Sequence, residues 1–219
     1  MNQRTVTGIV LNTVPIGEYD RRVVILTKED GKISAFAKGA RRPNSPLLGM
    51  ITPFCFGEFD LYVGRSSYTI QQARISNYFA ELRADMEGAY YGFYFLELAD
   101  YFAKEGNNEQ ELLKLLYQTL RALKNETIPN QLVRYIYEFK LYVINGLAPN
   151  PEIDAMVQHQ STQYTLQHIA YTAAEKLYSF TVTAEVLSEL GAVMKRYGQI
   201  GLDRELKSLE ILETIVATD

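Results

Sequence analysis

Residues 22–38 read RVVILTKEDGKISAFAK, and this stretch decides how the first part of the chain folds. One apolar run covers residues 22–27, a second covers residues 33–38, and Asp30-Gly31 lies between them. Asp-Gly between two such runs predicts a β-hairpin, because glycine readily adopts the positive φ angle that a tight turn requires. The first part of the chain is therefore expected to be β-structure.

Further strand-like runs surround this hairpin. Residues 5–14 are rich in Val, Ile, Leu and Thr, residues 54–63 carry apolar side chains at both parities, and residues 68–75 follow a short turn. Residues 39–46, GARRPNSP, can form neither a helix nor a central strand. Five strands with one long irregular connection predict a small closed barrel. The OB-fold is the commonest such barrel, and an SH3-like barrel is the alternative.

From Ala80 onward the apolar period changes from two to about 3.6, which indicates helices. Thr172 and Glu175 have the spacing of a helix-starting capping box. Residues 150–171 show no clear period. The expected fold class is α+β, with an amino-terminal five-stranded OB-fold barrel at 1–79 and an all-helical carboxy-terminal domain at 80–219 that includes a small irregular lobe at about 150–171. The expected helices cover residues 81–104, 108–123, 131–145, 172 onward, 184–197 and 204–216.

Charge is divided unevenly along the 219 residues. The whole chain has a net charge of −4. Residues 1–80 contain ten Lys/Arg and six Asp/Glu, a net charge of +4, so the remainder carries −8. A basic part joined to an acidic part is expected when only one end of a protein meets phosphates.

The residues that could support catalysis do not form a recognisable set. His159 and His168 fit no zinc or metalloprotease spacing, and Cys55 lies in an apolar run that is typical of a packed core thiol. The sequence has neither a glycine-rich phosphate loop nor a Gly-x-Ser-x-Gly motif. We therefore expect no catalytic residues, no metal site, no cofactor and no enzymatic activity.

The cellular compartment is indicated by what the sequence lacks. No apolar run reaches the roughly 18 residues needed to cross a bilayer, and the first residues lack the apolar core of a signal peptide. A single cysteine cannot form an internal disulfide. These features predict a soluble cytoplasmic protein with no membrane association.

A basic loop is the clearest candidate for a binding site. Lys38, Arg41 and Arg42 flank Gly39 and Ala40, and small residues let the backbone and the cations approach a phosphate closely. We expect three further cations to extend the same positive field. From the residues alone, a nucleic-acid site and a merely solvated surface are equally good interpretations. The three further cations are Arg21, Arg22 and Lys32.

Five stretches of the chain resemble the RecO family of bacterial recombination mediators. They follow the order found in that family and span nearly the whole chain. The most specific is AKGARRPNS at residues 37–45. The others are GEYDR at 17–21, YFLEL at 94–98, YEFKL at 137–141 with GLAP at 146–149, and LKSL at 206–209.

This resemblance implies an amino-terminal OB-fold followed by a helical domain, without a cofactor. It implies a DNA repair protein of the bacterial cytoplasm, associated with the nucleoid, that binds single- and double-stranded DNA and anneals complementary strands. The implied protein partners are the acidic tail of the single-stranded DNA-binding protein, RecR and, indirectly, RecA. With RecR, such a protein helps RecA replace the single-stranded DNA-binding protein on DNA.

The chain departs from the family at one place. Many relatives carry two Cys-x-x-Cys pairs that hold a structural zinc after the GLAP segment, whereas residues 150–157 of this chain read NPEIDAMV. A structural zinc site requires its full set of ligands. We therefore expect a metal-free lobe, held by a short hairpin around Tyr164 to Tyr171.

A receptor for an acidic tail with an apolar end requires cations beside an apolar groove. The helical domain is acidic overall, so its few cations are the natural candidates. We expect the groove to lie between the helices at residues 108–123 and 131–145. The expected tail-binding residues are Arg121, Arg134, Tyr137, Lys140 and Leu141.

Two other functions remain open from the sequence. The same basic loop on an OB-fold could bind RNA or associate with the ribosome. Alternatively, the chain could be a scaffold whose barrel binds another protein, which the charge of +4 on the barrel disfavours.

Overall fold

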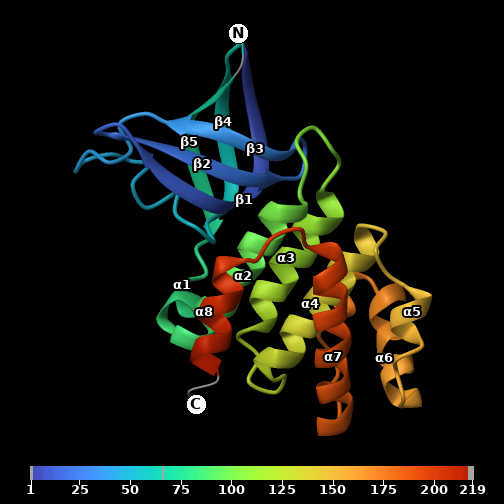
Figure 1. The fold of residues 1–219 in the computed structure, drawn as a ribbon. Coiled ribbons are helices and arrows are strands. Elements are labelled where there is room, and N and C mark those ends of the chain that lie inside the picture. The colour runs from blue at the N-terminus through green and yellow to red at the C-terminus, as the bar shows by residue number, and fades with distance from the viewer. Residues whose placement is uncertain (1, 66, 217–219) are drawn as a thin grey trace. The chain divides into compact units, whose positions relative to one another are not determined.

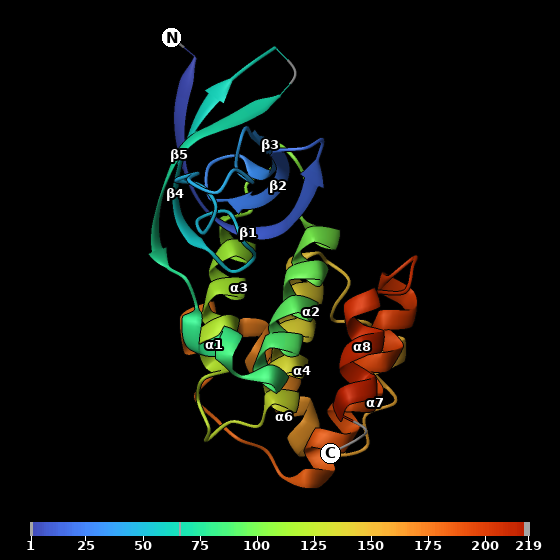
Figure 2. The same ribbon diagram turned by 90° about the vertical axis from the view of Figure 1, so that its left-hand side faces the viewer.

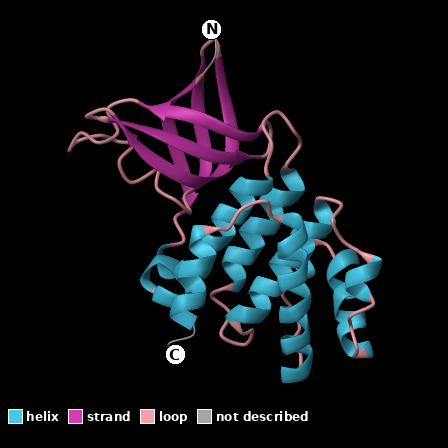
Figure 3. Ribbon diagram, in the orientation of Figure 1, coloured by secondary structure: helices cyan, strands magenta, loops and turns pink. Residues whose placement is uncertain are grey.

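The computed structural model describes residues 2–65 and 67–216. The chain divides into two compact units. The first contains the residues up to 80 together with residues 96–113, and the second contains residues 81–95 and those from 114 onward. Among the described residues, all strands precede all helices along the chain. Figure 3 distinguishes the strands from the helices by colour.

The first unit is built on a closed five-stranded barrel with the strand order β1-β2-β3-β5-β4 (Figure 1). All neighbouring strands are antiparallel except β3 and β5, which are parallel. The predicted OB-fold barrel is confirmed. The strands are β1 (Gln3–Ile16), β2 (Asp20–Thr27), β3 (Gly31–Ala37), β4 (Phe56–Val63) and β5 (Tyr68–Asn77).

The long strand β1 joins two sides of the barrel. Its first half pairs with β4 and its second half pairs with β2, so the strand curves around the barrel (Figure 2). The pairing with β2 shifts register between Val10 and Asn12. At this irregularity Val10 exchanges backbone hydrogen bonds with Phe54 and Cys55. A bulge of this kind increases local bending, which a closed barrel requires.

The predicted hairpin between β2 and β3 is present. Gly31 has a φ angle of +64°, in the region that favours glycine. The Thr27 hydroxyl donates a hydrogen bond of 2.8 Å to the Gly31 carbonyl and accepts one of 3.0 Å from the Asp30 N–H. A side chain at Gly31 would also collide with the carbonyl of Lys104. The turn therefore depends on glycine for both conformation and space.

The irregular connection between β3 and β4 forms part of the barrel core. Ala40, Leu47 and Ile51 from this segment are buried with Val23 and Ala35 of the strands. Cys55 is buried in the same cluster as a packed core thiol, as the sequence predicted. The segment is thus fixed by its apolar side chains although it has no regular structure.

The helices begin at residue 80. A single helix was expected over residues 81–104, but the structure breaks it at Asp85, whose carboxylate lies against Gly88 in the first turn of α2. Aspartate at this position caps a new helix rather than continuing the old one. The helices are α1 (Ala80–Ala84), α2 (Met86–Phe102), α3 (Gln110–Ala122), α4 (Asn130–Ile144), α5 (Pro151–Asp154), α6 (Gln160–Tyr171), α7 (Ala184–Gly201) and α8 (Lys207–Val216).

The expectation of an irregular lobe with a hairpin at residues 164–171 is wrong, because α5 and α6 occupy this region. Only Thr162, Leu166 and Ile169 of α6 are buried, at spacings of four and three residues. The helix is otherwise polar, so its apolar period is too weak to recognise in sequence.

The prediction that a helix begins at Thr172 is also wrong. Thr172 ends α6, where its N–H donates to the His168 carbonyl, and only a 3₁₀ turn (Ala174–Lys176) follows. A capping-box pattern cannot extend a helix when few apolar residues follow with a helical period.

The start of α6 is capped by a carboxylate from α7. Glu189 accepts hydrogen bonds from the backbone N–H groups of Gln158 and His159, and its Oε2 lies 3.1 Å from Nδ1 of His159. Partial burial would raise the pKa of the Glu189 carboxyl, but the hydrogen bonds outweigh it and lower that pKa to about 2.

Replacing Glu189 by Gln should lower the free energy of unfolding at pH 6 by about 1–3 kcal/mol, because charge-assisted hydrogen bonds are lost. The folded-state pKa of Glu189 lies below the unfolded value of about 4.3. Its contribution should therefore be complete above pH 5 and disappear as the pH falls toward 2. Urea denaturation at pH 6, 4 and 3 measures this.

The matched control is Glu205→Gln, since Glu205 is exposed and forms no hydrogen bond or ion pair with any described residue. This variant should leave the unfolding free energy unchanged. An equal effect of both substitutions, or a Glu189 effect independent of pH, would contradict the capping role.

Candidate nucleic-acid interface

The basic loop after β3 is held on the turn between β1 and β2. Gly39 has a φ angle of +64°, and its N–H donates a 2.7 Å hydrogen bond to Oδ1 of Asp20. The Arg41 N–H donates to the Tyr19 carbonyl at 2.9 Å. The positive φ angle of Gly39 turns the chain so that both bonds can form, and the cations of the loop are thereby placed on a fixed backbone.

Both arginines of the loop keep their charge exposed. Nη1 of Arg41 donates to the Gly17 carbonyl at 3.2 Å, and the Arg42 guanidinium lies over the Tyr19 ring, 5.2 Å from its centre. These contacts orient the guanidinium groups without neutralising them. Both side chains remain exposed to solvent.

Arg22 and Lys38 lie beside this loop. Arg22 is exposed on the outer face of β2, directly opposite Phe36 of β3, and Lys38 follows β3 immediately. We call Arg22, Lys38, Arg41 and Arg42 the basic cluster. None of these four forms an ion pair with a carboxylate of any described residue.

Two other predicted cations are not part of the basic cluster. Arg21 shares the inward parity of Val23 and is partly buried, with its Nε enclosed by protein. Lys32 lies six residues before Lys38, about 20 Å away along an extended strand. Its Nζ is 3.2 Å from Oδ1 of Asp100 and donates to the Asp100 carbonyl at 2.5 Å. The structure therefore groups only Arg22, Lys38, Gly39, Arg41 and Arg42.

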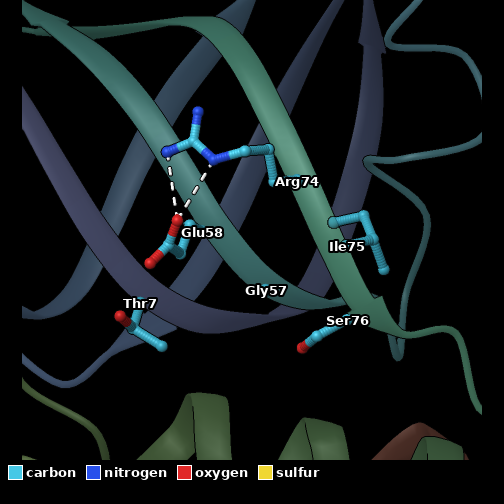
Figure 4. A pocket seen from close by; sticks show the side chains of 6 residues that line it. All are labelled: Thr7, Gly57, Glu58, Arg74, Ile75 and Ser76. Atoms are coloured by element: carbon cyan, nitrogen blue, oxygen red, sulfur yellow. Dashed lines mark hydrogen bonds and ion pairs between the residues drawn. The ribbon is translucent and has the colours of Figure 1, made fainter.

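The side of the barrel formed by β1, β4 and β5 is polar but electrically balanced. Arg74 contacts Glu58 at 3.1 Å and Asp60 at 2.5 Å, and hydrogen bonding from Arg74 lowers the pKa of the Asp60 carboxyl. A shallow pocket lies beside this group at Gly57, with Glu58 reaching toward Arg74 (Figure 4). Because Arg74 is paired with two carboxylates, its charge is not available to a phosphate.

In the second unit, an ion pair is buried around α4. Glu138 is 2% exposed and accepts hydrogen bonds from the Tyr94 hydroxyl at 2.6 Å and from Nε of Arg134 at 2.8 Å. Burial, followed by the negative charge of Glu138, raises the pKa of Tyr94 well above its ordinary value. Nη2 of Arg134 reaches Glu213 of α8 at 3.4 Å. Arg134 thus links a buried carboxylate to an exposed one.

Three of the five residues predicted to bind a partner tail are buried. Tyr137 and Leu141 are fully buried and cannot line an open groove. Lys140 is 6% exposed, and its Nζ donates to the Ala170 carbonyl at 2.8 Å. Arg121 is exposed and Arg134 is partly exposed. Only these two arginines present a cation to solvent.

Residues 2–65 and 67–216 contain neither a candidate metal site nor a helix able to cross a membrane. No group of three or more His, Cys, Asp or Glu side chains in these ranges is arranged to hold a metal ion. His159 pairs with Glu189, and His168 contacts the edge of Phe180. Within the same ranges, every helix is too short or too polar to span a bilayer.

The chain is similar to proteins of one family along most of its length. The family model described as "Recombination protein O N terminal" matches residues 1–79, and the model described as "Recombination protein O C terminal" matches residues 83–155. The chain is 29% identical to the DNA repair protein RecO of Acetivibrio thermocellus, and the alignment covers 98% of each protein. It is 41% identical to the RecO protein of Alkaliphilus metalliredigens over 65% of this chain and 58% of that protein.

Replacing Arg134 by Ala should destabilise the fold by about 3–5 kcal/mol, because it leaves Glu138 buried without its counter-ion. Urea denaturation at neutral pH measures the loss. Arg121→Ala is the control, since the Arg121 side chain is exposed and, within the part of the chain that the structure describes, bonds only to Gln118 on its own helix. It should cost less than about 0.5 kcal/mol. Equal effects of the two substitutions would contradict a structural role for Arg134.

Proposed function

The chain belongs to the RecO family of DNA repair proteins, and we propose that its basic cluster binds the phosphate backbone of DNA. The observation that carries this proposal is the uneven pairing of cations on the barrel. Arg4, Lys32 and Arg74 are paired with carboxylates. Lys28 and Arg65 have no carboxylate partner among the described residues, but each is a single cation in its own turn, whereas the basic cluster brings together four cations without such a partner. Exposed cations without counter-ions attract polyanions and release salt ions when they bind.

The geometry of the loop supports phosphate binding in particular. Arginine presents a planar fork that matches two phosphate oxygens, and small residues beside it allow close approach. In this chain Gly39 is only partly buried, and a Cβ added there would meet nothing closer than the Arg42 side chain. The glycine therefore leaves room for a phosphate next to the guanidinium groups.

We propose that the chain acts as a recombination mediator that binds DNA without catalysing a reaction. In this role it would bind single- and double-stranded DNA, anneal complementary strands and, together with RecR, help RecA replace the single-stranded DNA-binding protein. The site of action would be the bacterial cytoplasm, on nucleoid DNA. Membership of the RecO family supports this role, and the separation of a basic barrel from an acidic helical part fits a protein that contacts DNA and proteins with different surfaces.

For the acidic tail of the single-stranded DNA-binding protein, we propose a receptor centred on Arg121. Arg121 is exposed at the end of α3, and among the described residues its side chain hydrogen-bonds only to Gln118, at 3.3 Å. The outward nitrogen of Arg134 is a second contact point, because its pairing with the exposed Glu213 can exchange for pairing with another carboxylate.

Replacing Arg41 and Arg42 by Ala should weaken binding to unrelated DNA sequences alike. The slope of log affinity against log salt on single strands should also become shallower by about 1.4, because two phosphate contacts are lost. Fluorescence anisotropy with a labelled oligonucleotide at several salt concentrations measures both quantities.

The matched control removes the same charge elsewhere on the first unit. Lys28 and Lys104 are exposed at the end of the barrel that carries the β2–β3 turn, so Lys28→Ala with Lys104→Ala should leave affinity and slope nearly unchanged. Equal losses in both double variants would remove the basic cluster from the site. Tighter binding to RNA than to DNA of the same sequence would favour an RNA-binding role instead.

Reversing Arg121 to Glu should reduce binding of a synthetic acidic peptide with an apolar carboxy-terminal end by more than tenfold, as measured by calorimetry. Arg196→Glu is the control, because the Arg196 side chain is likewise exposed and, among the residues described, also bonds only to a glutamine three residues away. DNA affinity should not change in either variant. Peptide binding that is unaffected by Arg121→Glu would place the receptor elsewhere.

A further inference from the structure

Apolar side chains lie on the outer face of the barrel next to the basic cluster. Val14 of β1, Arg22 of β2 and Phe36 of β3 are directly opposite one another across the two strand pairs, so they form one row on the same face. Ile16 lies one row further along β1. Val14, Ile16 and Phe36 are 38%, 37% and 36% exposed. We call these three residues the apolar strip.

The exposed side chains of the apolar strip are not part of the barrel core. The core is filled by side chains on the opposite face of the same strands, among them Val23 and Ala35. A cross-strand row on the other side of the barrel consists of Thr5, Asp60 and Gln72, as expected for a face in water. An exposed aromatic residue beside unpaired cations therefore indicates a ligand that has both apolar and anionic parts.

A nucleic acid strand has this chemistry when its bases are unpaired. Bases stack on aromatic rings, and phosphates pair with cations, whereas in a duplex the base faces are already stacked on one another. Adjacent strands are about 4.8 Å apart, so Phe36 and Arg22 are close enough to contact the base and the phosphate of one nucleotide. The remaining apolar side chains can cover the neighbouring sugar or base.

We propose that Phe36 stacks on an unpaired base and makes this face of the barrel selective for single strands over duplexes. This inference rests on the proposed DNA binding and adds the residue that distinguishes the two forms of DNA. The basic cluster binds both forms through phosphates, and the apolar strip adds affinity only where a base is free to stack.

Phe36→Ala should lower affinity for an unstructured single-stranded oligonucleotide by roughly 5- to 100-fold and leave duplex affinity unchanged. Phe36→Trp should keep or increase single-strand affinity. Because the chain contains no other tryptophan, its fluorescence reports on position 36 alone. The single strand should quench this fluorescence, whereas a duplex of the same sequence should not.

Tyr78→Ala is the control, since Tyr78 is similarly exposed. Tyr78 follows the last residue of β5, whereas Phe36 pairs with Thr69 at the start of that strand. This substitution should leave both affinities unchanged. If wild-type protein binds DNA and Phe36→Ala weakens single strands and duplexes equally, or not at all, the inference fails and the proposed function stands. If wild-type protein binds neither form of DNA, the proposed function fails, and this inference fails with it.

Discussion

Closure of the barrel between β3 and β5 is the constraint on which the rest of the first unit depends. These two strands are parallel, so the chain cannot pass between them by a tight turn and must take a long route through residues 38–55 and β4. The apolar residues of that route, among them Leu47 and Ile51, are buried in the barrel core. The route is therefore anchored from inside while its polar residues stay in solvent. The basic loop is the first part of this route.

Two hydrogen bonds donated by the backbone of this segment fix the positions of its charged side chains. Gly39 bonds to Asp20, and Arg41 bonds to the carbonyl of Tyr19, so the loop after β3 and the turn after β1 form one surface. Side chains on a well-fixed backbone lose less freedom when they bind a ligand. The cations elsewhere on the barrel that pair with carboxylates, such as Lys32 and Arg74, stabilise local structure instead. The distribution of carboxylates thus selects which cations remain available to a ligand.

The helical unit places its charges differently. Arg134 and Glu138 lie one turn apart on α4 and pair in a largely buried environment, with Tyr94 as a second donor to the carboxylate. Burying two charges has a high desolvation cost, which the two hydrogen bonds to Oε1 of Glu138 offset only in part. The Phe95 and Tyr137 rings pack against each other in the same region, tilted by 50° and 4.8 Å apart between centres. This part of the fold therefore combines apolar packing with one specific polar contact that fixes how α2 and α4 face each other.

Features that depend on neighbouring residues could be predicted from the amino-acid pattern. The Asp30-Gly31 turn, the five strands, the period of α4 and the collection of cations at residues 38–42 are local, so composition and spacing were enough to predict them. Features that depend on residues far apart in the chain could be seen only in the tertiary structure. Asp100 pairs with Lys32 although the two residues are 68 positions apart in the chain. Helix α4 is surrounded by other elements, so the spacing of its apolar residues could not show that Tyr137, Lys140 and Leu141 are all buried. Helix α6 was not predicted because only three of its twelve residues are buried. In addition, the carboxylate that caps its start lies thirty residues later in the chain. Burial and ion pairing are properties of packing between segments, and a local pattern in the chain carries no information about which segments will meet.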